Sequence, residues 1–435
     1  MDVLTYRELL KIRTQLDASS RTATFSRRIW DERAANVDGL QYRHVLTPTD
    51  REVTVRDYAG ETRPMLMFGS NNYLGLATHP VVVKRVQDAI AEYGVGVGGP
   101  PALNGHGPLQ RELQERLAAL EGKEACLLYG TGYSANVGLM SALPSSKDYT
   151  VYDGSSHASF LDGMKLGKVK GQSFPHNDTK ALDLTLSEIR GDYRDVFVSV
   201  EGVYSMTGDV ARLDRVAEVA TRHNTVLIVD DAHGTGVTGP NGHGTIAMYD
   251  VADQVDVIVG TFSKTFAVSG GFIAASREVV EYLRYFSRAH VFSASLSTSV
   301  CAAVLAGLDV MEDEPHLHQR LMDLSGRFAE TLNGMGFEAD GITPIFSLRA
   351  PVGANVRAMA HAFHDRGLFV NHVEAPVVPA SEQRFRISLS ATHTDEDVAR
   401  LVEAIEEIWA LYTPRGDGLA EPVDEPRIDA FEGGF

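Results

Sequence analysis

The chain has 435 residues, of which 44% are hydrophobic and 23% charged, an ordinary globular composition with room for roughly two or three domains. Its formal charge of -18 at pH 7 opposes nonspecific binding to nucleic acid or to an anionic membrane surface. The two cysteines, Cys126 and Cys301, provide neither a disulfide framework nor a zinc cluster. Because the first residues lack the apolar core of a signal peptide and no apolar run reaches membrane-spanning length, we expect a cytoplasmic protein with no membrane span.

The first strongly patterned segment, residues 108–122, predicts an amphipathic helix. Four leucines recur in it at helical spacing, a proline suits the first turn, and a glycine suits the end. These residues are Pro108, Leu109, Leu113, Leu117, Leu120 and Gly122.

Short apolar runs then alternate with amphipathic segments such as residues 214–223. Each run is continuously apolar or rich in β-branched residues, as strands covered on both faces require. The predicted strands are residues 126–129, 149–152, 196–200, 225–229 and 255–259. This alternation predicts an α/β fold with a mainly parallel sheet.

The pattern changes near residue 300, where we expect a smaller C-terminal domain. A late helix is predicted in residues 392–412, with Thr394 and Asp397 placed as a capping box. Residues 413–435 hold six acidic residues against two arginines, with several prolines and glycines, a composition typical of disorder. The expected division is an N-terminal arm (1–60), a large domain (61–300), a small domain (301–412) and an acidic tail (413–435).

Three turns with glycines and polar or ionisable side chains follow predicted strands. The first, GTGYSAN (130–136), offers small residues with free backbone N–H groups, a nest for a phosphate. The second, DDAHGTG (230–236), and the third, GTFSKTF (260–266), follow two later strands. Because ligands bind beyond the carboxyl ends of parallel strands, we expect the three turns to form one site.

This combination suits pyridoxal 5'-phosphate (PLP). The aldehyde of PLP needs an amine for a Schiff base, which Lys264 provides, and its pyridine nitrogen stays protonated beside a buried carboxylate such as Asp230. Thr261 and Ser263 supply hydroxyl groups for the phosphate. Each residue also has a structural alternative: Asp230 as a strand-end cap, His233 as a core histidine. Asp230, Asp231 and His233 could form a metal site, but no further cluster at ligand spacing completes it.

The chain resembles the α-oxoamine synthases, a family of PLP enzymes, and its motifs are most similar to those of the serine palmitoyltransferases. The resemblance runs in order through eight motifs between about residues 65 and 410. The motifs are FGSNNYLGLATHP (68–80), GTGYSANVGLMSAL (130–143), DGSSHASFLDG (153–163), EGVYSMTGD (201–209), DDAHGTGVTGPNGHG (230–244), GTFSKTFAVSGGF (260–272), FSASL (292–296) and PVVPASEQRFRISLSATHT (376–394).

The resemblance implies the aspartate aminotransferase-type fold (fold type I), with a large, mainly parallel sheet domain, a small C-terminal α+β domain, and homodimers with active sites at the interface. It implies that Lys264 holds PLP covalently, Asp230 pairs with the pyridine nitrogen, His233 bonds the ring oxygen and His157 stacks on the ring. Arg386, assisted by Asn71, would bind the amino-acid carboxylate. The implied phosphate contacts are Thr131, Gly132, Tyr133, Thr261 and Ser263.

The implied reaction is a decarboxylative Claisen condensation of a small amino acid with an acyl thioester, carried by coenzyme A or an acyl carrier protein. Serine is the favoured amino acid, then alanine and glycine, because Ser156 precedes His157 and Ser263 precedes Lys264. An aminotransferase of the same fold would share Lys264 and Asp230, but it would lack the SNNYLGL and SHAS motifs. A noncatalytic partner subunit would be expected to lose Lys264. The GVGVGG run at 94–99 follows a helical stretch and does not predict a nicotinamide site.

The chain departs from the family pattern at positions outside the cofactor contacts. Polar residues replace a customary histidine, glutamate, arginine and proline, and the DEAHS motif reads DDAHG. The departures are Gln110, Gln114, Asp231, Gly234, His243 and Ser297.

Overall fold

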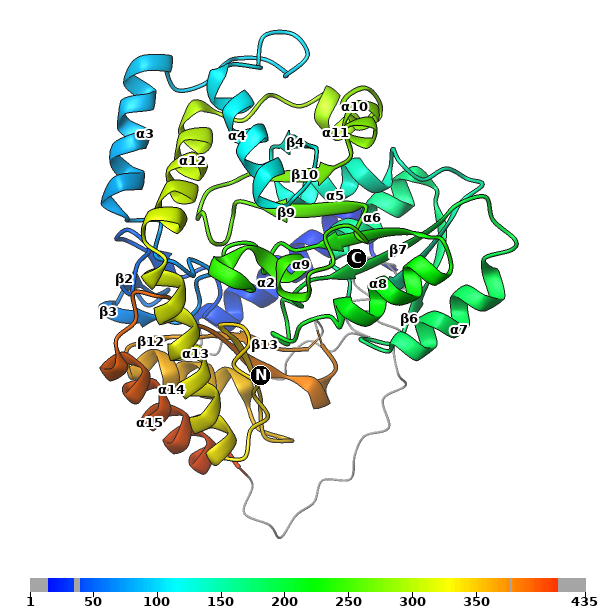
Figure 1. Cartoon of the computed structure of the whole chain (residues 1–435). Coiled ribbons are helices and arrows are strands. Elements are labelled where there is room, and N and C mark those ends of the chain that lie inside the picture. Colours follow the sequence, from blue (N-terminus) through cyan, green and yellow to red (C-terminus); the bar gives the residue numbers. More distant parts are fainter. Residues whose placement is uncertain (1–14, 35–39, 376–377, 414–435) are drawn as a thin grey trace.

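A computed structural model describes residues 15–34, 40–375 and 378–413, and its centre is a seven-stranded sheet (Figure 1). The strand order is β4-β10-β9-β8-β7-β5-β6, with β10 antiparallel to both neighbours and the other pairs parallel. The mainly parallel sheet expected from the sequence is therefore confirmed. The strands are β4 (Ala125–Tyr129), β5 (Tyr149–Asp153), β6 (Lys170–Phe174), β7 (Val196–Glu201), β8 (Val226–Asp230), β9 (Val257–Thr261) and β10 (Gly271–Ala275).

The sheet is buried on both faces, which explains the continuous apolar runs. Along β8, Leu227 and Val229 pack into one apolar core, whereas Ile228 packs into a second core on the opposite face. Strand β9 begins two residues later than its predicted start. Asp256 causes this offset, because its carboxylate accepts a hydrogen bond from Leu227 N at 2.7 Å and its own N–H donates to Leu227 O at 2.9 Å.

Helices cover the faces of this sheet, and the predicted ones are present. The stripe of leucines in α4 is confirmed by the burial of Leu109, Leu113 and Leu117. Thr394 and Asp397 form the predicted capping box of the last helix. The helices up to β10 are α2 (Ala18–Ala34), α3 (Pro80–Tyr93), α4 (Pro108–Leu120), α5 (Gly132–Met140), α6 (Ala158–Gly167), α7 (Thr179–Ile189), α8 (Leu213–Arg222) and α9 (Gly244–Tyr249). Those after it are α10 (Arg277–Phe286), α11 (Arg288–Val291), α12 (Thr298–Asp313), α13 (His316–Gly334), α14 (Val356–Asp365) and α15 (Asp395–Tyr412).

Two small sheets lie beside the large one. One has the order β11-β14-β13 and is antiparallel, and the other has the order β1-β2-β3-β12, in which β3 and β12 are parallel. The pairing of β3 with β12 joins an early segment of the chain to a late one. Their strands are β1 (His44–Val45), β2 (Glu52–Arg56), β3 (Thr62–Met67), β11 (Ile345–Arg349), β12 (Leu368–Phe369), β13 (Asn371–Val373) and β14 (Arg384–Ser388).

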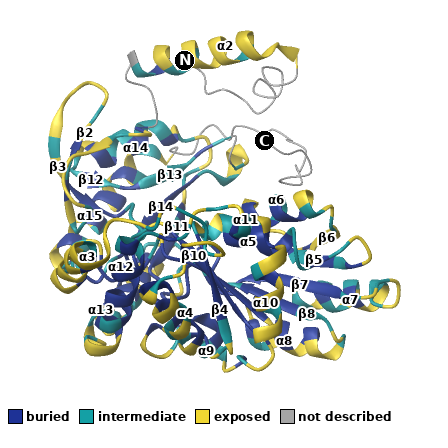
Figure 2. Cartoon of the chain, turned by 90° about the horizontal axis from the view of Figure 1, so that it is seen from above, coloured by how far each residue is buried: buried dark blue, intermediate teal, exposed yellow. Residues whose placement is uncertain are grey.

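Burial is concentrated in the large sheet and in the helices against it, whereas α2 is mostly exposed (Figure 2). None of the helices in the described ranges is long and apolar enough to cross a membrane. The expected domain boundaries stay a prediction. Within them, residues 1–14 of the arm and residues 414–435 of the tail lie outside the part that the structure describes.

Candidate active site

The candidate site is a cleft at the carboxyl ends of β7, β8 and β9. Its volume is about 780 Å³ with the open mouth included. The sequence-predicted residues that line it are Thr131, Gly132, Tyr133, His157, Asp230, His233, Thr261, Ser263 and Lys264. The remaining two, Asn71 and Arg386, bond each other, because Arg386 Nη1 donates to Asn71 Oδ1 at 3.0 Å.

Lys264 stands in the turn between β9 and β10, and backbone hydrogen bonds hold that turn. Phe262 N donates to Gly270 O and Val268 N donates to Phe262 O, both at 3.0 Å. Desolvation in the cleft lowers the pKa of Lys264 to about 8, although the nearby Asp230 carboxylate favours the protonated amine. A neutral amine is the form that attacks an aldehyde, so this environment suits covalent attachment of a carbonyl compound.

Asp230 ends β8 with both carboxylate oxygens bonded. Ala232 N donates to Oδ1 at 3.1 Å, and Asn136 Nδ2 donates to Oδ2 at 2.7 Å. Asn136 also contacts Ser159 Oγ at 3.0 Å, and Ser159 Oγ lies 2.7 Å from His157 Nδ1. This chain of bonds orients the carboxylate and the imidazole together. Sequence reasoning missed Asn136, although it lies within the GTGYSAN turn motif.

The GTGYSAN turn, a predicted phosphate nest, lies at the start of α5. Thr131 is the N-cap, and its side chain accepts from Ser134 N at 2.9 Å. A Cβ added to Gly132 would lie 2.8 Å from Thr261 Cβ, so glycine allows α5 to approach β9 closely. Thr261 Oγ1 and Ser263 Oγ are 3.0 Å apart. Two hydroxyls beside a helix N-terminus form a site for a phosphate.

His233 is a buried residue of the cleft wall, and its ring contacts the Tyr73 hydroxyl. Tyr73 Oη lies 2.8 Å from His233 Nδ1 and 3.2 Å from Asn71 Oδ1. Burial, with the positive charges of Lys264 and Arg386, holds the pKa of His233 well below its usual value. Tyr73 has one hydroxyl proton, and the Asn71 amide oxygen can only accept it, so with both contacts made His233 Nδ1–H donates to Tyr73 Oη. In the other tautomer, Tyr73 donates to Nδ1, and Nε2 carries the proton that can be donated to a ligand oxygen. Sequence reasoning missed Tyr73, although SNNYLGL contains it.

Arg386 is buried on β14 and keeps part of its guanidinium group available. Nε donates to Ser205 O at 2.6 Å, while Nη1 donates to Asn71 Oδ1 and to Ser388 Oγ at 3.0 and 3.1 Å. Nη2 is buried without a hydrogen-bond partner within the described residues. A buried donor without a partner is costly, and a substrate carboxylate would satisfy it.

Glu201, at the end of β7, is a cleft residue that sequence reasoning missed. It is the register partner of Asp230 on the adjacent parallel strand. Burial, reinforced by the charge of Asp230, raises the pKa of Glu201 well above its usual value. The neutral form of Glu201 is therefore favoured beside the Asp230 carboxylate. Its position at the end of a buried strand was the available sequence signal.

These features fit PLP. The cleft combines an amine with a lowered pKa, an oriented carboxylate and a phosphate nest, which are the three groups that PLP requires. The metal alternative lacks support, because the Asp231 carboxylate accepts from Thr245 N at 2.7 Å instead. Within the described part of the chain, no group of three or more His, Cys, Asp or Glu residues is placed to hold a metal ion.

Several departures from the family pattern have structural explanations. Gln110 accepts from Gly107 N at 3.1 Å and donates to Leu296 O at 3.0 Å, which ties α4 to the FSASL segment. Ser297 caps α12 by accepting from Val300 N at 3.4 Å. Gln114 bonds His106, and His243 is the N-cap residue of α9. Gly234 lies against Asp231, because a Cβ added at position 234 would lie 2.0 Å from Asp231 Oδ1.

Comparison with known proteins identifies the family. The model of aminotransferase class I and II matches residues 63–405. Serine palmitoyltransferase of Sphingobacterium spiritivorum is 35% identical over 369 residues, which cover 85% of this chain and 91% of that protein. The 8-amino-7-oxononanoate synthase of Hahella chejuensis is 36% identical over 80% of this chain and 88% of that protein.

Solved structures agree. The structure of Sphingomonas wittichii serine palmitoyltransferase superimposes with a TM-score of 0.84 at 30% identity and covers 91% of this chain and 99% of that one. A serine palmitoyltransferase structure solved with PLP also gives 0.84, at 28% identity over the same shares. The chain belongs to the aminotransferase class I and II family and has its fold type I architecture. Within that family it is an α-oxoamine synthase, a PLP-dependent acyltransferase.

Capture of PLP by the cofactor-free protein should depend on the protonation of Lys264. Because its pKa is lowered to about 8, the neutral amine dominates above that pH, and the rate of PLP attachment should fall about tenfold per pH unit below it. Stopped-flow absorbance with added PLP measures this rate, and the Lys264→Ala variant is the control that forms no borohydride-fixable product. A rate that keeps rising up to the pKa of an ordinary lysine, about 10.4, would contradict this environment.

Proposed function

We propose that the protein condenses a small amino acid, L-serine first, with an acyl thioester, releasing carbon dioxide and free thiol and giving an α-amino ketone. The observation that carries this proposal is the buried Nη2 of Arg386 beside the Lys264 cleft, which has no hydrogen-bond partner in the described part of the chain. A guanidinium group held by Asn71 and Ser205 is suited to bind the carboxylate of an amino acid. Fixing that carboxylate positions the α-proton for removal.

We assign the other roles from the contacts of each side chain. Bound PLP withdraws electrons from the α-carbon of the amino acid. Lys264, once free, accepts the α-proton as general base, consistent with its lowered pKa. Asp230 would hold the proton of the pyridine nitrogen, His233 would bond the ring oxygen and His157 would stack on the ring. Thr131, Gly132, Tyr133, Thr261 and Ser263 would hold the phosphate. Of these, Tyr133 also donates from its hydroxyl to Asp162.

The residues that precede His157 and Lys264 favour serine over alanine and glycine as the amino-acid substrate. Serine- and alanine-using members resemble this chain in having a serine before the histidine and before the lysine, here Ser156 and Ser263. The serine palmitoyltransferases among the similar proteins support the same choice. The thioester is proposed to be carried by coenzyme A or by an acyl carrier protein.

We expect L-serine to give the highest kcat/KM of the three amino acids, by roughly tenfold over glycine, because hydroxymethyl recognition adds a polar contact. The PLP-loaded protein should be incubated with L-serine, L-alanine or glycine and a series of acyl-CoA and acyl carrier protein thioesters, with product masses read out. Condensation with glycine alone would reject serine but keep the reaction class. Transamination in place of condensation would reject the proposed reaction.

Replacement of Arg386 by lysine should raise KM for the amino acid about 10-fold or more, because an ammonium group cannot replace the planar fork. The KM for the acyl thioester should change little, since the fork is assigned to the amino-acid carboxylate. Arg384→Lys is the matched control, because Arg384 lies two residues earlier on β14 and bonds Glu382. Equal effects of the two substitutions on the amino-acid KM would remove Arg386 from this role.

We also propose that the protein works as a homodimer, as the family resemblance implies. Analytical ultracentrifugation at assay concentration should give a dimer of the 47.3 kDa chain. A monomer that is fully active at the same concentration is the outcome that contradicts this assembly.

A further inference from the structure

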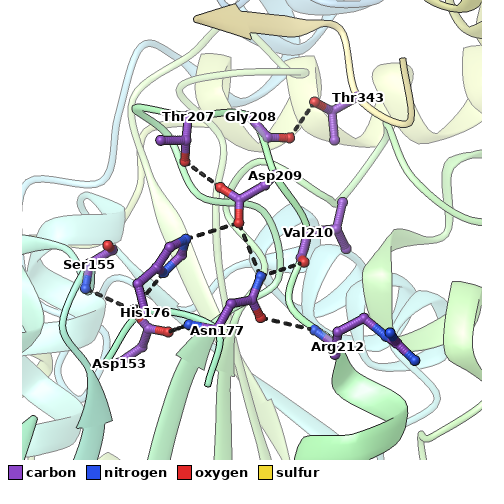
Figure 3. Close-up of polar contacts among 10 residues, drawn as sticks. All are labelled: Asp153, Ser155, His176, Asn177, Thr207, Gly208, Asp209, Val210, Arg212 and Thr343. Atoms are coloured by element: carbon purple, nitrogen blue, oxygen red, sulfur yellow. Dashed lines mark hydrogen bonds and ion pairs between the residues drawn. The ribbon is translucent and has the colours of Figure 1, made fainter. Parts of the chain in front are cut away.

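His176 lies between two carboxylates outside the cleft (Figure 3). Its Nδ1 is 2.9 Å from Asp153 Oδ1, and its Nε2 is 2.9 Å from Asp209 Oδ2. The ring also meets the buried Tyr204 edge to face, with 4.3 Å between the ring centroids. Both ring nitrogens can donate at once only when the imidazole is protonated. Burial lowers the pKa of His176, but the two hydrogen bonds and the charges of the two carboxylates outweigh it and raise the pKa to about 10, so the ring is a cation at neutral pH.

Asp153 connects this cation to the turn that carries His157. Asp153 ends β5 and is fully buried. Its Oδ1 accepts from Ser155 N at 2.8 Å, and its Oδ2 accepts from Asn177 N at 2.8 Å. The backbone N–H of Ser156 donates to Asp153 O at 3.0 Å. Asp153 therefore fixes the backbone conformation of residues 153–157.

Asp209 connects the same cation to the loop between β7 and α8, residues 202–212. Its carboxylate also accepts from Asn177 Nδ2 at 3.0 Å and from Thr207 Oγ1. Thr343, which lies before β11, donates to Gly208 O at 2.7 Å from the other side of the loop. Four residues before Asp209, the carbonyl of Ser205 accepts the 2.6 Å bond from Arg386 Nε.

Among the contacts of this cluster in the described part of the chain, His176 is the one positive charge that lies next to both Asp153 and Asp209. Asn177 bridges them through its backbone and side chain, but an amide carries no charge. Without the imidazolium, the buried Asp153 carboxylate and the half-buried Asp209 carboxylate would lie near each other with no cation between them, and their negative charges would repel. The loops would then relax apart.

We propose that His176 is a positioning residue for the amino-acid site: its two ion pairs hold the turn of His157 and the loop of Ser205 in the relative position that cofactor and substrate carboxylate require. The inference rests on the proposed roles of His157 and Arg386. His176 itself would contact neither PLP nor the amino acid. The proposal predicts which substitutions near His176 weaken serine binding and which also shift the absorption band of bound PLP.

The test uses the full-length, PLP-loaded protein with three variants. His176→Ala should raise the dissociation constant of L-serine, followed by the visible absorbance change, about 10-fold, and should shift the absorption band of bound PLP. Asp209→Asn should raise the serine dissociation constant severalfold and leave that band unchanged, because it loosens only the Ser205 side. It also keeps the proposal testable if His176→Ala does not fold. His223→Ala is the matched control, since it removes a 2.7 Å histidine pair with Asp183 on the α7 and α8 side.

Amide hydrogen exchange of the PLP-loaded protein without amino acid provides a readout that does not depend on the substrate. His176→Ala should speed exchange in residues 153–157 and 202–212 about 10-fold, whereas His223→Ala should not. Unchanged exchange in both segments, or a serine dissociation constant as in wild type, overturns the positioning role. If wild type itself responds to none of serine, alanine and glycine, the proposed function fails, and the exchange comparison still decides the role of His176.

Discussion

The active-site end of this protein depends on the register in which β7, β8 and β9 lie side by side. Glu201 pairs with Asp230, and Asp230 pairs with Val259. Because the three strands are parallel, their last residues and the turns that follow emerge at one edge. A shift of one residue would turn the Asp230 side chain to the opposite face and separate it from Lys264. The buried strands allow no such shift, since each packs into a core on both faces.

Burial then shifts the pKa values of the ionisable side chains at this edge of the sheet. It raises the pKa of Glu201 and lowers the pKa values of His233 and Lys264, so each moves toward its neutral form. Asp230 contributes a carboxylate to this site, and Arg386 contributes a guanidinium group. In the proposed reaction, the protonated pyridine ring would face the Asp230 carboxylate, and the amino-acid carboxylate would face the Arg386 guanidinium group. Under this proposal, the charges of the site are arranged for both ligands before either binds.

The sequence predicted the parts of the fold and site that depend on local pattern. The buried strands, the leucine stripe of α4 and the Thr394 capping box were visible because period, composition and cap chemistry are local. Long-range pairing was not visible in this way: β9 is offset by the bonds of Asp256 to Leu227, and β3 joins β12 across about 300 residues. In the site, strand-end turns and family motifs placed Lys264 and Asp230 in one cleft. Sequence reasoning missed four side chains whose contacts come from tertiary neighbours, although three of them stand within the quoted motifs. The three are Asn136, Tyr73 and Glu201. His176 stands outside those motifs, and its two carboxylate partners come from distant segments.

The surroundings of Asp231 show that some motif positions cannot vary independently. Its Oδ1 occupies the space into which a Cβ on Gly234 would project, at 2.0 Å, and a Cβ on Gly202 would lie 1.9 Å from the same atom. Gly202 and Gly234 come from two different motifs, yet they share one acidic neighbour. A side chain at position 234 therefore fits only if the Asp231 carboxylate moves, so the shorter acid of DDAHG and its glycine depend on each other sterically. The two departures from the family pattern at positions 231 and 234 occupy one shared volume and have one structural explanation.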